Sequence, residues 1–168
     1  MSSNNLSKVK RNIKELKILI ENLCENDFLI ISEISSLISK TLRSGGCIFW
    51  CGNGGSASQS QHLAAELIGR FKNNRVPYRS LSLTSDSTVI TCISNDFGYE
   101  NLFSRQLEAL GNEGDLLMVL SSSGNSINLK NAIKTAKSKS IKSISLLGKK
   151  GGLIKDYADY SLIINSDI

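Results

Sequence analysis

A histidine and a glutamate four residues apart, His62 and Glu66, are the side chains of this sequence best placed for chemistry. The surrounding apolar pattern predicts a helix over about residues 57–70, and at that spacing both side chains project from one helical face. Together they could hold a metal ion, or the carboxylate could move a proton as a general base. The same spacing is also typical of a surface pair that only exchanges a hydrogen bond.

A glycine-rich loop, residues 52–58, precedes this helix and follows an apolar run over residues 47–51. Glycines let the backbone approach a ligand closely, and the first N–H groups of the next helix attract an anion. The letters also fit the G-x-G-x-x-A dinucleotide fingerprint, which requires an acidic residue about 20 positions further on. Residues 71–75 contain none, so the loop favours another anionic ligand over a dinucleotide.

A second loop, residues 121–126, reads SSSGNS and lies between another apolar run and a helical pattern. Four hydroxyls, a flexible glycine and the N–H groups of a helix start are suited to holding a phosphate dianion. The alternative is a serine-rich turn in which Ser126 only caps the helix. Because such loops follow two different strands, the pattern favours phosphate binding.

Length and charge limit the function classes. The 168 residues are enough for one domain with a full core. The net charge is +5, but the lysines of the C-terminal half are spread without the aromatic residues that stack on bases, so we expect no nucleic-acid partner. No apolar run reaches the roughly 18 residues of a membrane span, and the N-terminus lacks the apolar core of a secretion signal. We therefore expect no membrane association and a cytoplasmic location.

The four cysteines, Cys24, Cys47, Cys51 and Cys92, contain no C-x-x-C pair. A chain long enough for a full core needs no disulfide staples, so we expect them to be reduced and mostly buried. Cys47 and Cys51 lie four apart in a predicted strand, where they would face one side of the sheet as small apolar side chains rather than ligate a metal.

Two amphipathic helices come first, at about residues 4–24 and 27–43, and we expect a helical hairpin over residues 1–44. Such a hairpin can pack against another subunit, which favours a homo-oligomer. Over residues 45–168, short apolar runs alternate with helical patterns, as in βαβ units. The sequence thus predicts one α/β domain, a three-layer αβα sandwich with a doubly wound parallel sheet. Ligands of such sheets collect at the carboxyl ends of the strands.

The chain contains the stretches CGNGGSASQSQHLAAELIGRFKNNR from Cys51, ISNDFGYENLFSRQLEALGNEGDLLMVLSSSGNSINL from Ile93, and LLGKKGG from Leu146. In order and spacing they resemble the phosphoheptose isomerases of the sugar isomerase (SIS) superfamily, over nearly the whole chain. The resemblance implies an SIS fold, a tetramer and conversion of sedoheptulose 7-phosphate to D-glycero-D-manno-heptose 7-phosphate through an enediol. That reaction is the first step towards ADP-heptose and bacterial surface polysaccharide.

The resemblance also implies roles for individual residues. His62 and Glu66 match zinc ligands, and Glu66 is the expected base, while a metal at His62 would polarise the carbonyl. Asn95 and Asp96 would meet the sugar hydroxyls. The other substrate-binding positions are Asn53, Gly54, Gly55 and Ser56 in the first loop, and Ser121, Ser122, Ser123 and Ser126, which would hold the phosphate, in the second.

The sequence departs from the family at its end. Family members continue past the last strand with a helix that supplies a glutamine and a second histidine, whereas this sequence ends at Ile168 and has His62 as its one histidine. Zinc held by His62 and Glu66 alone would lack two ligands of a usual site. Either a C-terminal piece of the intact protein is missing, or the chain is naturally short with weakened chemistry. The apolar surface that a missing helix would expose favours the first explanation.

Two further functions stay open at this point. One is a non-catalytic SIS module, either a sugar-phosphate-sensing regulator or a protein of the replication-initiator-associating type, suggested by the missing helix. The other is an amino-sugar phosphate isomerase or deaminase, because the loops specify a phosphate better than they specify the number of carbons beyond it.

Overall fold

The computed structural model describes residues 2–166, with side-chain environments from residue 5 onward. The strands are β1 (Ile48–Gly52), β2 (Ser80–Ser82), β3 (Leu116–Ser121), β4 (Lys142–Gly148) and β5 (Tyr160–Ile164). The helices are α1 (Ser2–Glu21), α2 (Glu25–Arg43), α3 (Gly55–Ile68), α4 (Ser87–Phe97), α5 (Leu102–Leu110) and α6 (Ile127–Ser138), with 3-10 turns η1 (Tyr99–Asn101) and η2 (Ile154–Asp156). The strand predicted over residues 47–51 is β1, shifted by one residue.

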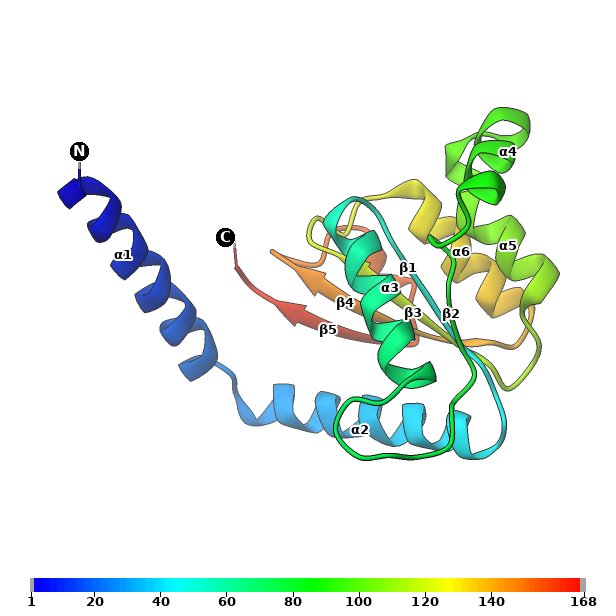
Figure 1. Ribbon diagram of the computed structural model, residues 1–168, viewed down its shortest axis with the longest axis horizontal. Helices are drawn as coiled ribbons and strands as arrows, with labels where there is room; N and C mark the ends of the chain where they lie inside the picture. Colours follow the sequence, from blue (N-terminus) through cyan, green and yellow to red (C-terminus); the bar gives the residue numbers. More distant parts are fainter. Residues whose placement is uncertain (1, 167–168) are drawn as a thin grey trace.

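The five strands form one parallel sheet in the order β2-β1-β3-β4-β5. Helices α2 and α3 cover one face, and α4, α5 and α6 cover the other (Figure 1). The predicted three-layer, doubly wound α/β fold is confirmed. In a sheet of this order the connections leave in opposite directions from β1 and β3, and the crevice between their carboxyl ends is where ligands bind.

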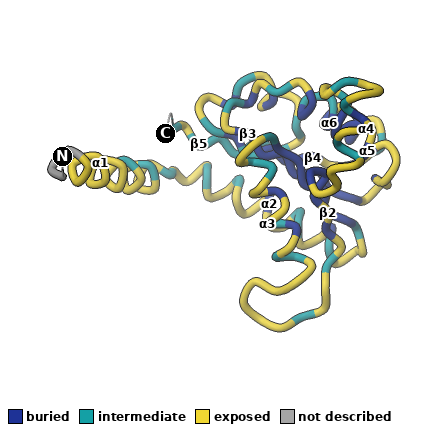
Figure 2. The backbone as a smooth tube through the Cα atoms, turned by 45° about the horizontal axis from the view of Figure 1, so that its top comes forward, coloured by how far each residue is buried: buried dark blue, intermediate teal, exposed yellow. Residues whose placement is uncertain are grey.

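Strand alternation divides the core into two halves. Phe49, Cys51 and Val119 point towards α4, α5 and α6, whereas Trp50 and Met118 point towards α2 and α3. Because successive side chains of a strand face opposite sides, the central strands must be apolar throughout, and every residue of β1 and β3 is buried. Figure 2 shows this buried sheet between more exposed helices. The result is a rigid platform for the loops at the strand ends.

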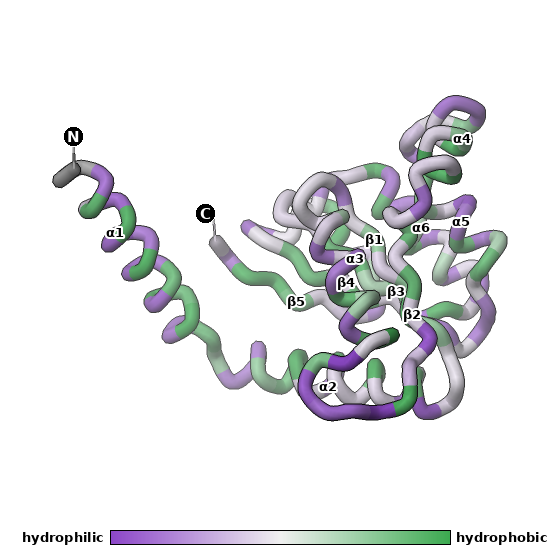
Figure 3. Tube along the Cα trace, in the orientation of Figure 1, coloured by the Kyte–Doolittle hydropathy of each residue, from purple (hydrophilic) through white to green (hydrophobic). Residues whose placement is uncertain are grey.

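The two predicted N-terminal helices are present, but they do not fold back on each other as a hairpin. Helix α1 leads away from α2 and from the sheet (Figure 1), and apolar and polar residues alternate along its length (Figure 3). Its apolar stripe is exposed, with Ile13 at 63% and Ile20 at 60%. A stripe that lacks a partner within the described chain cannot hold a hairpin together, since most helix stability in proteins comes from packing such a face.

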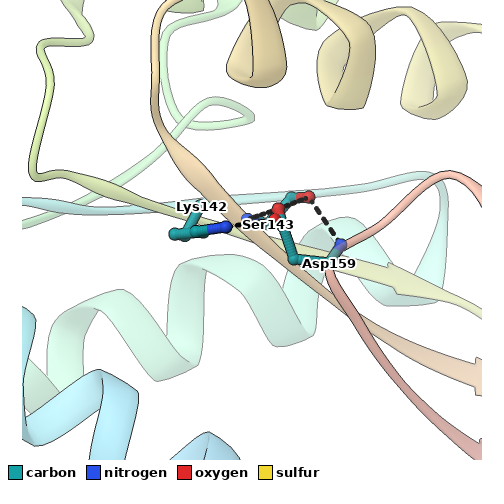
Figure 4. Close-up of polar contacts among 3 residues, drawn as sticks. All are labelled: Lys142, Ser143 and Asp159. Carbon is teal, nitrogen blue, oxygen red and sulfur yellow. Dashed lines mark hydrogen bonds and ion pairs between the residues drawn. The ribbon is translucent and has the colours of Figure 1, made fainter.

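Two carboxylates fasten the amino ends of the strands. Asp115, which is buried, accepts hydrogen bonds from the main-chain N–H groups of Cys47 (2.7 Å) and Asn112 (2.8 Å), so it joins the starts of β1 and β3. Asp159 accepts from Lys142 Nζ (2.7 Å) and from the main-chain N and Oγ of Ser143 (both 2.9 Å), which joins β4 to β5 (Figure 4).

The surroundings of Asp159 also set its acidity. Partial burial raises the pKa of Asp159, but the hydrogen bonds from Lys142 and Ser143 outweigh this effect, and the pKa lies below its usual value. The pKa of Lys142 is raised by the same hydrogen bond. The charged forms of both groups are therefore the ones that the folded chain stabilises.

The cysteine prediction is half right. Cys47 and Cys51 are buried on the same side of the sheet, as expected, and burial raises the pKa of both thiols, that of Cys47 to about 11. Cys24, just before α2, and Cys92, within α4, are exposed instead. Among residues 2–166, no helix is both long and apolar enough to cross a membrane.

Candidate active site

The glycine loop turns the chain from β1 into α3. Gly54 has a φ of +55°, a conformation that side-chain-bearing residues rarely adopt, and it directly precedes the first residue of α3. A Cβ on Gly54 or Gly55 would meet no atom of the described residues within 4 Å, so the backbone is open on that side. The turn is closed by the N–H of Ser56, which donates to the carbonyl of Asn53 (3.0 Å). The loop therefore presents free backbone at a helix N-terminus, which suits an anion.

The serine loop is held from within. Ser121 Oγ accepts from the N–H of Gly124 (3.0 Å), and Ser123 Oγ accepts from the N–H of Asn125 (3.3 Å). These two hydroxyls shape the loop, whereas Ser122 is exposed. Ser126 lies at the N-cap of α6 but makes no side-chain capping bond among the described residues, which argues against its being only a cap. Its hydroxyl and the N–H groups of Ile127 and Asn128 stay available to a ligand, whereas the N–H of Leu129 donates to Asn128 Oδ1.

Close packing fixes the serine loop from outside. A Cβ on Gly124, which has a φ of +65°, would collide with the carbonyl of Gly151, and a Cβ on Gly148 would lie 2.8 Å from the carbonyl of Ser122. The carbonyl of Gly124 also accepts from the N–H of Ile154 (2.9 Å). The LLGKKGG stretch is thus the support on which the serine loop rests.

A cavity of about 410 Å³ lies between the two loops. Ser56, Gln59 and Leu63 line it from α3, and Ser121 and Ser122 line it from the serine loop. Its floor is apolar, formed by side chains at the ends of β3, β4 and β5. The structure therefore brings the two predicted loops to one site. Gln59 was not predicted, although its spacing of seven from Glu66 places both on one stripe of α3.

His62 and Glu66 lie further along α3. His62 Nε2 is 4.0 Å from Glu66 Oε1, which is too long for a hydrogen bond, and the histidine side chain is 64% exposed. Glu66 Oε2 is buried and has no hydrogen-bond partner among residues 2–166. An unpaired buried carboxylate oxygen is costly, and in native proteins it marks a place where a proton, ion or ligand belongs. Glu66 Oε2 thus has lone pairs available to accept a proton or to bind a metal ion.

The end of α3 is fastened by a residue that the sequence did not suggest. Arg75 donates to the main-chain carbonyls of Glu66 (2.7 Å) and Leu67 (2.8 Å), which satisfies two of the open carbonyls at the helix C-terminus. It therefore binds the backbone of Glu66 and leaves the carboxylate free. The rise of about 1.5 Å per residue puts Glu66 roughly 10 Å from Gln59 along the helix axis.

The described residues do not complete a zinc site. His62 and Glu66 are suitable donors, and the open Glu66 Oε2 would suit a cation. However, no three side chains of His, Cys, Asp or Glu gather anywhere in residues 2–166. Structural zinc takes four ligands and catalytic zinc takes three from protein. The two residues on α3 can therefore be part of a metal site but cannot form one by themselves.

Asn95 and Asp96 lie near the end of α4, where both are exposed. Asn95 Nδ2 donates to Asp96 Oδ1 (2.7 Å), and Cys92 Sγ lies 3.7 Å from Asp96 Oδ2. Neither lines the cavity between the loops. The link between this region and the loops comes from Tyr99, two residues after α4, whose hydroxyl reaches Asn53 (2.9 Å).

Comparison with known proteins agrees with this geometry. The SIS domain family matches residues 12–148. The phosphoheptose isomerase of Akkermansia muciniphila is 46% identical over 137 residues, 82% of this chain and 72% of that protein. The one from Sulfurimonas denitrificans is 43% identical over 161 residues, 95% of this chain and 83% of that protein.

Solved structures give the same result. A phosphoheptose isomerase from Francisella tularensis superposes with a TM-score of 0.90 at 30% identity, covering 100% of this chain and 88% of that one. The enzyme from Neisseria gonorrhoeae gives a TM-score of 0.84 at 32% identity, covering 98% and 86%. With a fold, two strand-end loops and a sequence that all agree, the chain belongs to the SIS domain family and, within it, to the phosphoheptose isomerases.

Proposed function

We propose that this protein is an aldose–ketose isomerase that converts sedoheptulose 7-phosphate to D-glycero-D-manno-heptose 7-phosphate. The substrate class comes from relatives named phosphoheptose isomerases at 43% and 46% identity. The observation that carries the chemistry is the buried, unpartnered Oε2 of Glu66 on the helix that leaves the glycine loop. These relatives disfavour a regulator or an amino-sugar phosphate isomerase. The first step towards ADP-heptose remains a prediction from the resemblance.

In this proposal the phosphate binds at the serine loop and the carbonyl end of the sugar lies towards Glu66. Glu66 takes a proton from C1 of the ketose, which gives an enediol, and returns it to C2. Meanwhile a second proton passes from the hydroxyl oxygen on C1 to the oxygen on C2, so that atoms balance. In the proposal His62, which lies beside Glu66 and is exposed, serves these two oxygens. The glycine-loop residues Asn53, Gly54, Gly55 and Ser56 bind the chain between. Contacts of Asn95 and Asp96 with its hydroxyls remain a prediction from the resemblance, because neither residue lines the cavity.

Zinc enters the proposal only as a bound group with further ligands. His62 and Glu66 would supply two donors, and the rest would come from outside the described residues of one chain. When bound, the ion would polarise the carbonyl. Metal analysis of purified protein tests this: zinc that is retained by the wild type and lost in both His62→Ala and Glu66→Gln supports the role. Equal zinc in all three proteins contradicts it.

We also propose that the protein is a homo-oligomer, a tetramer, assembled through α1. The support is the exposed apolar stripe of that helix, in which Leu6, Val9 and Leu16 are each more than half exposed. Light scattering should give about four times the 18.3 kDa mass of one chain. Ile13→Glu, on the stripe, should lower that mass, and Lys14→Glu, off the stripe, should not. A wild-type mass of one chain would contradict the proposal.

The decisive experiment follows aldose formation from sedoheptulose 7-phosphate, with and without added zinc. The comparison includes Glu66→Gln and, as a matched control on an exposed loop, Glu113→Gln. Turnover that survives in the control and disappears in Glu66→Gln supports the isomerase. Absence of turnover under all metal conditions, or faster turnover of fructose 6-phosphate, would refute the proposed substrate.

A further inference from the structure

Three polar side chains from three separate elements meet beside the glycine loop. Asn53 comes from the end of β1, Tyr99 from η1 and Asn128 from the first turn of α6. The two asparagines exchange a pair of hydrogen bonds: Asn53 Nδ2 donates to Asn128 Oδ1 (3.0 Å), and Asn128 Nδ2 donates to Asn53 Oδ1 (2.9 Å). The hydroxyl of Tyr99 lies 2.9 Å from the same Asn53 Oδ1. Of the three residues, only Asn53 was suggested by the sequence.

The direction of every bond in this cluster is set by one main-chain group. The N–H of Leu129 points at Asn128 Oδ1 (2.9 Å), and a main-chain N–H can only donate. This fixes which amide atom of Asn128 is oxygen, and therefore which atom of Asn53 must face it. The oxygen of Asn53 must then face Asn128 Nδ2, so the Tyr99 hydroxyl must be a donor. The hydrogen-bond network therefore assigns the oxygen and nitrogen of the Asn53 amide, and the flipped assignment is excluded.

Within the cluster, the side chain of Asn53 can still donate one hydrogen bond but cannot accept another. Its Oδ1 already accepts two bonds, which uses both lone pairs, and one of its two Nδ2 hydrogens is engaged. What remains is a single side-chain N–H. Asn53, Tyr99, Ser126 and Asn128 border a second cavity, of about 570 Å³, so that N–H is beside open space. The Tyr99 oxygen, having donated its proton, can still accept one.

We infer that Asn128 and Tyr99 are positioning residues that hold Asn53 as a hydrogen-bond donor to an oxygen of the sugar phosphate. The inference rests on the proposed function and adds two residues to its binding site. Orienting the amide before the substrate arrives removes the entropy cost of ordering it on binding. It also selects an acceptor, such as a hydroxyl, carbonyl or phosphate oxygen, at this point of the ligand. Asn128 is 3% exposed and its amide is bonded to Asn53 and to the N–H of Leu129, which gives it the role of a support, although it also borders the cavity.

If the hydrogen bond from Tyr99 to Asn53 served only stability, its removal would lower the melting temperature and leave KM unchanged. Tyr99 is 52% exposed, and a hydrogen bond at such a site adds little to stability because water replaces it. Removing the hydroxyl should therefore leave the melting temperature unchanged. A change in substrate KM under those conditions has to come from the site itself, either through the orientation of Asn53 or through a direct contact of the Tyr99 oxygen, and the double variant below separates the two.

Two variants test the inference, with a matched control. Tyr99→Phe removes one donor to Asn53 Oδ1 and should raise KM about three- to tenfold while kcat changes less. Asn128→Asp keeps the acceptor for Asn53 Nδ2 but replaces the donor with a carboxylate oxygen. In either orientation of its amide, Asn53 Oδ1 then faces a carboxylate oxygen, so the reciprocal pair is lost, the amide is no longer held, and KM should rise more than tenfold. Tyr157→Phe, a 41% exposed tyrosine on the far side of α6, should match the wild type.

The double variant sharpens the test. If Tyr99 and Asn128 act through the same amide, then Tyr99→Phe should cost less in the Asn128→Asp background than alone, because the orientation is already lost. Independent, additive effects would contradict a shared role. An Asn128→Asp protein that fails to fold leaves Tyr99→Phe as the deciding variant.

The outcomes separate this inference from the proposed function. Turnover by the wild type with unchanged KM in both variants overturns the inference and leaves the isomerase intact. If the wild type binds sedoheptulose 7-phosphate in calorimetry without converting it, the proposed reaction fails, and weaker binding by the variants still supports the positioning role. Equal binding by all proteins, or no binding by the wild type, overturns it.

Discussion

The carboxylates at the amino ends of the strands and the carboxylate on α3 differ in how completely they are used. At the amino ends, Asp115 accepts two main-chain N–H groups, and Asp159 accepts three hydrogen bonds from Lys142 and Ser143. On α3, by contrast, Glu66 has a buried oxygen with no partner among the described residues. The hydrogen-bonding capacity of Asp115 and Asp159 is used within the fold. That of Glu66 Oε2 is not, and this oxygen can therefore take part in the proposed chemistry.

The loops at the two ends differ in the same way. At the amino ends, side chains grip the backbone, so the strands are joined by charge-assisted bonds that persist without a ligand. At the carboxyl ends, the backbone is shaped by glycines and leaves N–H groups and hydroxyls unspent. The amino ends of the strands are thus fastened by side-chain hydrogen bonds, and the carboxyl ends keep groups free for a ligand. Ligand sites of α/β folds lie at the carboxyl ends of the strands.

Glu66→Gln should separate activity from stability most strongly. The carboxamide keeps the size of the side chain but cannot take a proton, so turnover of sedoheptulose 7-phosphate should fall by about 10²- to 10⁴-fold. Because the unpartnered charge is removed, urea denaturation should show a free energy of unfolding equal to or above that of the wild type. A large loss of stability would mean that Glu66 is a structural carboxylate like Asp115.

Asp115→Asn should have the opposite profile. One of the two N–H groups of Cys47 and Asn112 would then face an amide NH₂ instead of an oxygen, inside a buried site. The free energy of unfolding should fall by about 2–4 kcal/mol, as measured by urea denaturation, with kcat per folded molecule unchanged. Asp156→Asn, on the exposed turn η2, is the control. A loss of kcat without loss of stability would show that the two ends of the sheet are not independent.

Two glycines with positive φ allow the loops to be compared directly. Gly114, before β3, has a φ of +89° and open space around an added Cβ, whereas Gly124 has a φ of +65° and packs against Gly151. Alanine should cost about 1–3 kcal/mol of backbone strain at either position. Only Gly124→Ala should also raise the KM of the substrate, because the collision displaces the serine loop. Equal kinetic effects in both variants would show that the packing against Gly151 does not matter.

The sheet and its loops could be predicted because their signals are local. Apolar runs near Cys47 and Asp115 mark the strands, and the glycine and serine loops directly follow two of them. The lack of a hydrogen-bond partner at Glu66 Oε2 could not be predicted, because it depends on which donors the folded chain brings near this oxygen. Nor could the Asn53, Tyr99 and Asn128 cluster, whose members are up to 75 residues apart and carry no motif.

The failed expectation of a hairpin has a similar cause. The apolar stripe of α1, through Ile13 and Ile20, correctly predicts a helix but cannot say what the stripe packs against. Periodicity identifies a face, and only the folded arrangement identifies its partner. The same limit applies to Cys92, which was expected to be buried with the other cysteines and is exposed.

The smallest expected effect concerns Asp159 and acid. Its folded pKa lies below the ordinary 3.8, so the folded state binds this proton less readily than the unfolded state, and the group stabilises the fold above about pH 4. That contribution should disappear as the pH falls through the lower folded value. Asp159→Asn should therefore cost about 1 kcal/mol or less at pH 7, since the side chain is partly exposed. It should also flatten the decline of unfolding free energy between pH 5 and pH 3, measured in urea. An identical decline in wild type and variant would mean that Lys142 and Ser143 do not fasten β4 to β5 through this charge, and that the amino ends of the sheet depend on Asp115 alone.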